Sequence, residues 1–325
     1  MAEDPTLADV GEFALIERIG HIVGRGAVRP GDVGIGDDAA VLSLGTDPRV
    51  VATTDVLVEG RHFRLDWSSA YDIGRKAAAQ NIADIEAMGA RPVCLLVGLA
   101  ASGTTTVRFA EGIARGLADE AASVGAVVAG GDTVGADQIT VSVTALGSLD
   151  GRAPVLRSGA GVGDELWLAG LLGWSAAGLA LLERGDADLI GRHREVVDSH
   201  LVPRPPYGYG ELAAAAGATS MIDVSDGLLA DLQHVLDASG VGADLTLPEC
   251  DDIVIAAARD LGVDPGQWLR GGGEDHALLF TIPGNLPPPA HVSLRRLGTI
   301  SAAVGIRIDG VAAEADVFDH FAPRA

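Results

Sequence analysis

The segment Met221-Ile222-Asp223-Val224-Ser225-Asp226-Gly227 joins a predicted strand to a predicted helix. Its first four residues form a short, largely apolar run, which is typical of a buried strand. Apolar residues recur at helical spacing after the glycine and predict an amphipathic helix; they are Leu228, Leu229, Leu232, Val235 and Leu236. Two carboxylates, Asp223 and Asp226, therefore stand at a strand-to-helix junction.

Strand-like runs and helical patterns alternate along the rest of the chain. In the first half, strands are predicted at 50–53, 93–100, 126–129 and 139–146, and helices at 71–88 and 107–124. In the second half, further strands are predicted at 165–169, 276–282 and 304–308, and helices at 175–183 and 211–216. Because the glycine- and proline-rich stretch 149–163 separates the halves, we expect an α/β (α+β) protein with domains at 1–150 and 151–325.

Carboxylates follow several other apolar runs. Asp55 comes directly after Thr53 and Thr54 at the end of one run, and Asp132 follows a pair of glycines at the end of another. Asp38 belongs to an aspartate pair in the glycine turn 34–38. Each has a local explanation when taken singly, because Gly-Asp is a common turn and Asp is common at loops.

Taken together, these carboxylates indicate a metal site. Asp84 adds a further one and lies three residues after Asn81, on the same face of a predicted helix. Charges held partly buried by apolar neighbours are costly without cations. Oxygen ligands from aspartate and hydroxyl groups suit Mg²⁺ better than Zn²⁺, so the sequence predicts a magnesium site.

The chain of 325 residues carries a formal net charge of −22. Such a charge repels nucleic acid and acidic lipid headgroups, so we expect neither as a partner, whereas a polyanionic substrate needs divalent cations between it and the protein. No apolar run approaches the roughly 20 residues that span a bilayer, and the N-terminus is acidic and unlike a signal peptide. We therefore expect a cytoplasmic protein without a membrane segment.

Basic residues limit the kinds of nucleotide site. Lys76 is the single lysine, and it lies in Gly-Arg-Lys-Ala-Ala, which is neither a Walker A loop nor the strand motif of protein kinases. Metals and arginine would then have to contact any ATP phosphates. Cys94 and Cys250 show no metal-ligand spacing and are expected to be reduced and structural.

Two further features are weaker signals. The loop Arg-Gly-Gly-Gly-Glu-Asp-His at 270–276 allows a ligand to approach the backbone closely, although an ordinary tight turn explains the glycines equally well. His62 lies shortly after Asp55, and a lone histidine is more often structural than functional.

In order along the chain, these motifs resemble the thiamine-monophosphate kinase family, a member of the aminoimidazole-ribonucleotide synthetase-like superfamily. The resemblance covers essentially the whole chain. Its motifs are Gly-Glu-Phe-Ala-Leu-Ile (11–16), Gly-Ile-Gly-Asp-Asp-Ala-Ala (34–40), Thr-Thr-Asp (53–55), Glu-Gly-x-His-Phe (59–63), Asn-Ile-Ala-Asp-Ile-Glu-Ala-Met-Gly-Ala (81–90), Gly-Gly-Asp-Thr (130–133), Asp-Val-Ser-Asp-Gly-Leu (223–228), Gly-Gly-Glu-Asp (272–275) and Asp-His-Phe (319–321).

The resemblance implies the fold and the reaction. The expected fold is two-domain and aminoimidazole-ribonucleotide synthetase-like, with N-terminal strands forming a dimeric β-barrel in a homodimer and a C-terminal α/β domain. The expected reaction is the ATP- and Mg²⁺-dependent phosphorylation of thiamine monophosphate to thiamine diphosphate, the last step of thiamine diphosphate biosynthesis. Direct in-line transfer needs no covalent nucleophile, so no catalytic side chain is assigned.

The resemblance also implies ligand sets at matching positions. The implied Mg²⁺ ligands are Asp38, Thr53, Thr54, Asp55, Asp84, Asp132, Asp223 and Asp226. The implied ATP contacts are Gly131, Asp132, Arg157 and Ser225, and the implied substrate contacts are His62, Glu274 and Phe318. Phe318 stands in for a tryptophan that some family members have near Asp-His-Phe.

Other functions stay open at this point. Selenophosphate synthetase would need a reactive cysteine near the N-terminus, and the hydrogenase maturation protein a C-terminal cysteine, and the chain has neither. The imidazole-ring synthetase is harder to exclude from the residues alone. A non-enzymatic, acidic cation-binding protein is a further alternative, although the spacing of a calcium-binding loop is absent.

Overall fold

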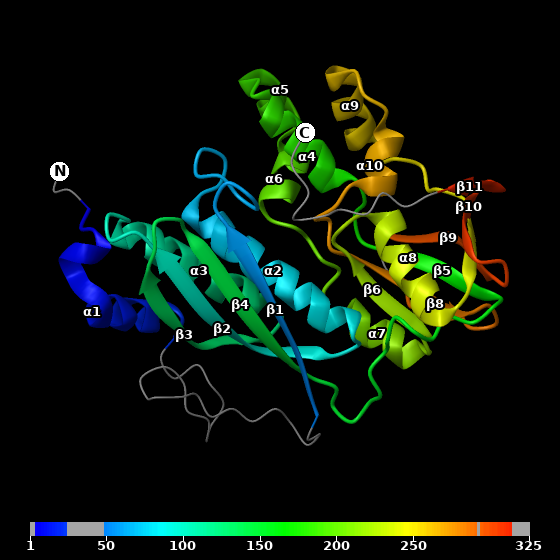
Figure 1. The fold of residues 1–325 in the computed structure, drawn as a ribbon, viewed down its shortest axis with the longest axis horizontal. Helices are drawn as coiled ribbons and strands as arrows, with labels where there is room; N and C mark the ends of the chain where they lie inside the picture. The colour runs from blue at the N-terminus through cyan, green and yellow to red at the C-terminus, as the bar shows by residue number, and fades with distance from the viewer. Residues whose placement is uncertain (1–3, 25–48, 291–292, 314–325) are drawn as a thin grey trace. The chain divides into compact units, whose positions relative to one another are not determined.

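The computed structural model describes residues 4–24, 49–290 and 293–313, which form two compact units (Figure 1). Unit 1 comprises Met1–Ile85 and Ala90–Ala153, and unit 2 comprises Glu86–Gly89 and Pro154–Ala325. None of the helices in these ranges is long and apolar enough to cross a membrane.

Unit 1 contains a four-stranded mixed sheet. Its strands are β1 (Val50–Val58), β2 (Arg91–Ala101), β3 (Val127–Gly135) and β4 (Thr140–Ser148), in the order β1-β4-β2-β3. The β1–β4 and β2–β4 pairs are antiparallel, and the β2–β3 pair is parallel. Strands β1 and β3 are longer than predicted, because they include the polar residues that were expected to follow them in loops.

Three helices belong to unit 1: α1 (Leu7–Ile22), α2 (Ala70–Ala87) and α3 (Val107–Ser123). Glycines let the backbones of α2 and α3 approach closely, since a Cβ added to Gly74 would lie 2.1 Å from the carbonyl oxygen of Ile113. Helix α1 was not predicted; it begins with a capping box between Thr6 and Asp9.

Unit 2 contains a seven-stranded sheet in the order β11-β10-β7-β9-β5-β8-β6. Its strands are β5 (Asp164–Ala169), β6 (Ser220–Val224), β7 (Gly242–Leu245), β8 (Ala277–Pro283), β9 (Leu294–Ser301), β10 (Gly305–Ile308) and β11 (Val311–Ala313). Only the β7–β10 pair is parallel among the described strands of this sheet.

Helices cover both faces of this sheet. The helices packed on its two faces are α7 (Tyr209–Ala216) and α8 (Leu228–Ser239). The other described helices of unit 2 are α4 (Trp174–Arg184), α5 (Ala187–Arg192), α6 (Arg194–Leu201), α9 (Asp252–Leu261) and α10 (Pro265–Gly271). Alternate residues of β8 enter different cores: Leu279 packs with leucines of α8, and Leu278 and Phe280 pack with Tyr209 of α7. Burial on both faces explains the continuous apolar run in β8.

Glu86, in the last turn of α2, belongs to unit 2 and is hydrogen-bonded to the start of α7. The Glu86 carboxylate accepts the backbone N–H groups of Gly208 and Gly210 over 2.8 and 3.1 Å. Burial raises the pKa of Glu86 to about 7, although the two N–H groups act in the opposite direction. The two mixed sheets with their covering helices confirm the predicted α/β (α+β) class and two-domain fold.

Candidate functional site

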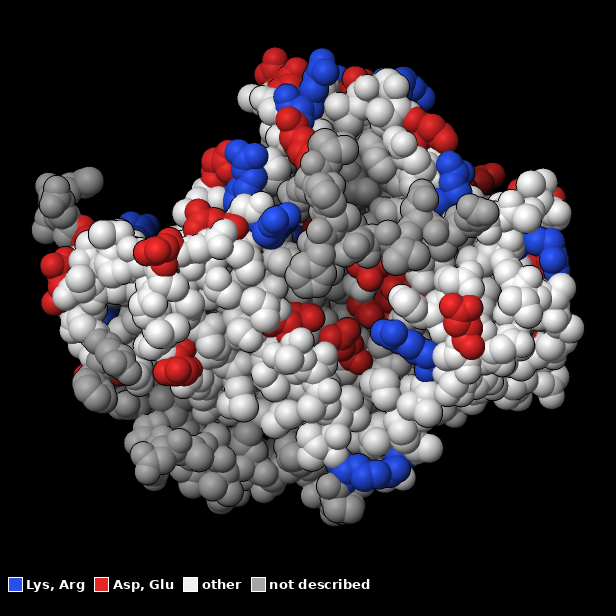
Figure 2. Space-filling model, viewed as in Figure 1, with Lys and Arg blue, Asp and Glu red and all other residues white. Residues whose placement is uncertain are grey.

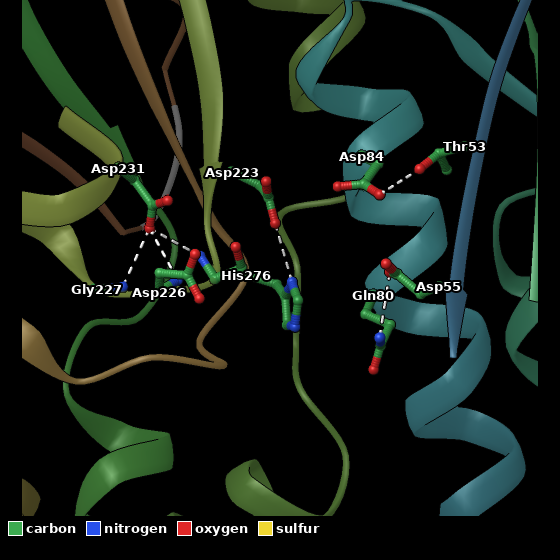
Figure 3. Close-up of polar contacts among 10 residues, drawn as sticks. Thr53, Asp55, Gln80, Asp84, Asp223, Asp226, Gly227, Asp231 and His276 are labelled. Carbon is green, nitrogen blue, oxygen red and sulfur yellow. Dashed lines mark hydrogen bonds and ion pairs between the residues drawn. The ribbon is translucent and has the colours of Figure 1, made fainter. Parts of the chain in front are cut away.

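In unit 1, three of the predicted metal ligands lie where β1 meets α2 (Figure 3). The Thr53 hydroxyl donates to Asp84 Oδ2 over 2.7 Å, and Gln80 Nε2 donates to Asp55 Oδ2 over 3.2 Å. The backbone N–H of Asp55 donates to the buried Asn81 Oδ1 over 3.1 Å. Thr53 and Gln80 are neutral donors, so these two contacts orient the carboxylates without adding positive charge, whereas the bond to Asn81 joins the backbone of β1 to α2.

Thr54 lies on the opposite face of β1, because neighbouring strand residues point to opposite sides of the sheet. It is exposed, and its hydroxyl donates to the carbonyl oxygen of Val143 over 3.1 Å and accepts from Thr144 Oγ1 over 3.0 Å. The structure therefore separates the Thr54 hydroxyl from Thr53 and Asp55.

Gly131 and Asp132 lie inside β3, and not in a loop after it as predicted. The sheet register aligns Asp55 with Val143, then Val97, then Gly131, so three strand spacings, or about 14 Å, separate β1 from β3. Asp132 is exposed, and its Oδ1 accepts the next backbone N–H over 2.8 Å. Within one chain, Asp132 is thus not brought to Asp55.

His62 lies in the turn that follows β1. Its Nδ1 accepts the backbone N–H of Val58 over 3.0 Å, and its carbonyl oxygen accepts from Lys76 Nζ over 3.0 Å. Lys76 is only 2% exposed. The single lysine therefore supports the turn that carries His62.

In unit 2, the predicted ligands Asp223 and Asp226 lie at the end of β6 and just after it (Figure 3). Asp223 is buried, and its Oδ2 lies 3.0 Å from Nδ1 of His276. Asp231, in the first turn of α8, accepts the backbone N–H groups of Ser225, Asp226 and the following glycine. Burial, and then the charge of Asp223, raises the pKa of Asp231 to about 7.

The predicted glycine loop lies against this junction. The backbone N–H of Glu274 donates to the carbonyl oxygen of Ser225, and that of His276 donates to Val224, each over 2.8 Å. A Cβ at Gly273 would lie 2.5 Å from the Ser225 oxygen, so glycine is required for this approach. Glu274 and His276 adopt left-handed φ values of 62° and 51°.

Glu274 also lies near a buried polar pair. Its Oε2 is 3.4 Å from Nδ1 of His200, which lies 3.0 Å from the Ser175 hydroxyl. The next residue, Asp275, accepts the backbone N–H groups of Gly173 and Ser175 at the start of α4. Burial raises the pKa of Asp275 to about 7, although these N–H groups oppose the shift.

In the described part of the chain, Arg157, a predicted ATP contact, makes no hydrogen bond or ion pair with these clusters. Arg157 is exposed and lies beside the start of β6, since the backbone N–H of Met221 donates to the carbonyl oxygen of Leu156. Ser225 follows the other end of that strand. Asp38 and Phe318 lie outside the described residues.

Comparisons with known proteins identify the family. Two family models match the chain: AIR synthase related protein, N-terminal domain, at residues 36–149, and AIR synthase related protein, C-terminal domain, at residues 161–280. The thiamine-monophosphate kinase of Mycobacterium tuberculosis is 52% identical over 290 residues, which cover 88% of this chain and 84% of that protein. The chain belongs to the thiamine-monophosphate kinase family.

Solved structures of this family share the fold. The thiamine-monophosphate kinase from Stenotrophomonas maltophilia K279a has a TM-score of 0.80 and 32% identity, covering 94% of this chain and 98% of that one. AaThiL complexed with AMPPCP and TMP has a TM-score of 0.78 and 26% identity, covering 98% of this chain and all of that one. The predicted family and its fold are confirmed, whereas pairing of the strands with a second subunit stays a prediction.

The donor atoms of the thiamine-monophosphate kinase motifs fit Mg²⁺. In the parts of the chain that the structure describes, no group of three His, Cys, Asp or Glu side chains could hold a metal ion by itself. Mg²⁺ usually keeps several waters and takes only one or two carboxylates together with substrate phosphates. Oxygen donors from Asp55 and Asp84 in unit 1, and from Asp223 and Asp226 in unit 2, suit such open coordination.

Sequence reasoning missed the residues that hold these donors. His276 pairs with Asp223 across 53 sequence positions, and no local pattern announces such a contact. Asp231 had a weak signal, because an acidic residue in the first turn of a helix can accept unpaired backbone N–H groups. Asn81 lies on the predicted helix face, but only the fold shows that β1 meets it and its neighbour Gln80.

Proposed function

We propose that the chain transfers the γ-phosphoryl group of ATP to the phosphate of thiamine monophosphate, forming thiamine diphosphate and ADP in a Mg²⁺-dependent reaction. The observation that carries the proposal is the set of carboxylates on β1 and α2, which neutral donors orient and which the family motifs contain. The family neighbour complexed with AMPPCP and TMP supports the choice of both substrates.

The proposed metal ligands are those of the family motifs. Mg²⁺, when bound, supplies positive charge between the ATP phosphates, the acceptor phosphate and the acidic residues. Thr53, Gln80 and Asn81 hold the ligands of unit 1 in place, and His276 holds Asp223. Acidic and basic side chains are interspersed on the face in Figure 2. The described residues of this face therefore form no continuous positive surface to attract phosphates, and Mg²⁺ has to neutralise them at the site.

No covalent intermediate is proposed. An oxygen of the acceptor phosphate attacks the γ-phosphorus in line, and the bond to the ADP oxygen breaks. The acceptor is already largely ionised at neutral pH because the second pKa of a phosphate monoester is about 6, so a strong general base is not needed. Catalysis then consists of positioning and charge stabilisation.

We propose substrate contacts on two loops. His62 and Glu274 would contact thiamine monophosphate, and Ser225, Gly131 and Arg157 would contact ATP. The hydrogen bond from the backbone of Glu274 to that of Ser225 supports this assignment, because it fixes the spacing between one proposed substrate contact and one proposed nucleotide contact.

We also propose that unit 1 mediates a homodimer. The outer face of its sheet carries exposed apolar side chains on two strands: Val50 is 44% exposed, Val56 is 47% exposed and Val134 is 62% exposed. Apolar side chains gathered on a sheet face favour association with another apolar surface. A second copy of β1 to β4 would cover them, and sedimentation equilibrium tests this directly.

Product analysis tests the reaction. The purified protein is incubated with ATP, Mg²⁺ and thiamine monophosphate, and the products are separated by chromatography, with free thiamine and a metal-free sample as controls. We expect thiamine diphosphate and ADP in equal amounts, only with the monophosphate and only with metal. If the protein binds ATP and Mg²⁺ but forms no thiamine diphosphate, thiamine monophosphate is not the acceptor. The acceptors of related synthetases would then be tested.

A further inference from the structure

One carboxylate oxygen holds the backbone of the loop between β6 and α8. Oδ2 of Asp231 accepts three consecutive backbone N–H groups, from Ser225 and Asp226 over 3.0 Å each and from Gly227 over 3.1 Å (Figure 3). Asp231 is only 3% exposed. Consecutive N–H groups that converge in this way form an anion-binding nest, and here the anion is the protein's own side chain.

The nest lies under proposed ligands of the metal and the nucleotide. Asp226 and Ser225 belong to the same three residues whose N–H groups Asp231 accepts. From the other side, the backbone of Glu274 donates to Ser225. The loop is therefore fixed on two sides, and Asp231 supplies the contacts from its own helix.

Burying the Asp231 carboxylate near other acidic residues is energetically unfavourable, which is unusual for a purely structural residue. The buried carboxylate of Asp231 lies beside Asp226 (Figure 3), and a buried carboxylate near another acidic residue is destabilising unless cations or strong donors compensate. Three N–H donors compensate part of the cost. Outer residues that orient metal ligands commonly change metal affinity 10- to 100-fold when they are replaced.

We propose that Asp231 is a positioning residue for Mg²⁺ binding, acting through the loop backbone that carries Ser225 and Asp226. The inference rests on the proposed function, because it takes Asp226 as a metal ligand. It assigns Asp231 no contact with the metal or the substrates.

The test compares Asp231→Ala and Asp231→Asn with a matched control. Asp231→Asn keeps an acceptor oxygen at the same position, whereas Asp231→Ala removes it. Asp164→Ala is the control, because Asp164 is also buried in unit 2 and its Oδ2 likewise accepts a backbone N–H, from Gly161 over 2.8 Å. Binding of Mn²⁺ in place of Mg²⁺ is measured by electron paramagnetic resonance with a non-hydrolysable ATP analogue, so the readout is independent of turnover.

We expect Asp231→Ala to weaken Mn²⁺ binding by about tenfold or more, Asp231→Asn by less, and Asp164→Ala by less than about twofold. Equal Mn²⁺ binding by Asp231→Ala and wild type would overturn the proposal, as would an equal loss in the Asp164→Ala control. If Asp231→Ala does not fold, Asp231→Glu is measured in its place, because it shifts the acceptor oxygen by one methylene. Wild-type Mn²⁺ binding by Asp231→Glu would then also contradict the proposal. If the variants change Mn²⁺ binding as expected but the wild-type protein forms no thiamine diphosphate, only the proposed function is refuted, and the role of Asp231 in metal binding stands.

Discussion

His276 Nδ1 lies 3.0 Å from Asp223 Oδ2, and both side chains are less than a tenth exposed. The contact joins the end of β6 to the residue just before β8. It fixes a proposed metal ligand from a segment that also carries the proposed substrate contact Glu274. Removing one partner of a buried hydrogen bond leaves the other polar group unsatisfied, which costs about 1–3 kcal/mol.

Replacing His276 should therefore affect metal use. We expect His276→Ala to lower turnover by about tenfold or more and to raise the Mg²⁺ concentration for half-maximal rate. His276→Asn should recover much of the loss, because an asparagine amide can reach the position of Nδ1. Steady-state rates over a Mg²⁺ series measure both effects.

His193 offers the control for that experiment. It is also a buried histidine of unit 2, and at the start of α6 its Nε2 lies 2.9 Å from Oδ2 of Asp260 in α9. His193→Ala should reduce stability while leaving the kinetic constants within about twofold of wild type. A similar loss of turnover in both alanine variants would mean that His276 acts only on stability.

Gly131→Ala should destabilise unit 1 by about 1–3 kcal/mol. Its Cβ would lie 2.0 Å from the backbone carbonyl oxygen of Val97, which belongs to the paired strand and cannot move aside freely. Gly135→Ala, in the same strand, meets no atom within 4 Å and is the matched control. Denaturant unfolding compares the two, and equal midpoints would contradict the close packing of β2 on β3.

The two cysteines should differ in reactivity. Burial raises the pKa of Cys94 to about 11, so at pH 8 its thiolate fraction is on the order of 0.1%. Burial and the nearby charges of Asp264 and Asp251 raise the pKa of Cys250 as well, but that residue is only partly buried. Mass spectrometry after iodoacetamide treatment of the folded protein should find Cys250 modified first, and equal rates would contradict the burial of Cys94.

Direct transfer predicts inversion at phosphorus. With ATP whose γ-phosphoryl group is made chiral by oxygen isotopes, one in-line displacement should give thiamine diphosphate of inverted configuration. Retention would require two displacements and hence a phosphorylated protein side chain, which the proposed mechanism excludes.

The sequence predicted the strands that pattern alone can identify. Runs of β-branched residues marked β1, β2 and β4, and the helical spacing of apolar residues marked α3 and α8. Short elements such as α5, β7 and β11 escaped, because a few residues carry little periodicity. Helix α1 escaped as well, since Gly11, with φ at 74°, interrupts its pattern.

The candidate site was predictable as a set of carboxylates but not as an arrangement. Motifs located Asp55, Asp84 and Asp223, because residue type and local context carry that information. The motifs do not show how the strands pair. The strand register places the Thr54 side chain on the opposite face of β1 and Asp132 three strand spacings from that strand. Contacts between residues distant in sequence, such as His276 with Asp223, depend on the whole fold of unit 2.

The rate of thiamine diphosphate formation by wild type and by Asp55→Asn, measured side by side with ATP and Mg²⁺, decides whether the β1 carboxylate takes part in phosphoryl transfer. This substitution keeps the shape of the side chain while removing its charge, so thermal unfolding without metal should change little. We expect one ADP for each thiamine diphosphate in wild type and a rate at least about 100-fold lower in Asp55→Asn. Absence of thiamine diphosphate with wild type, or an undiminished rate with the variant, would contradict it.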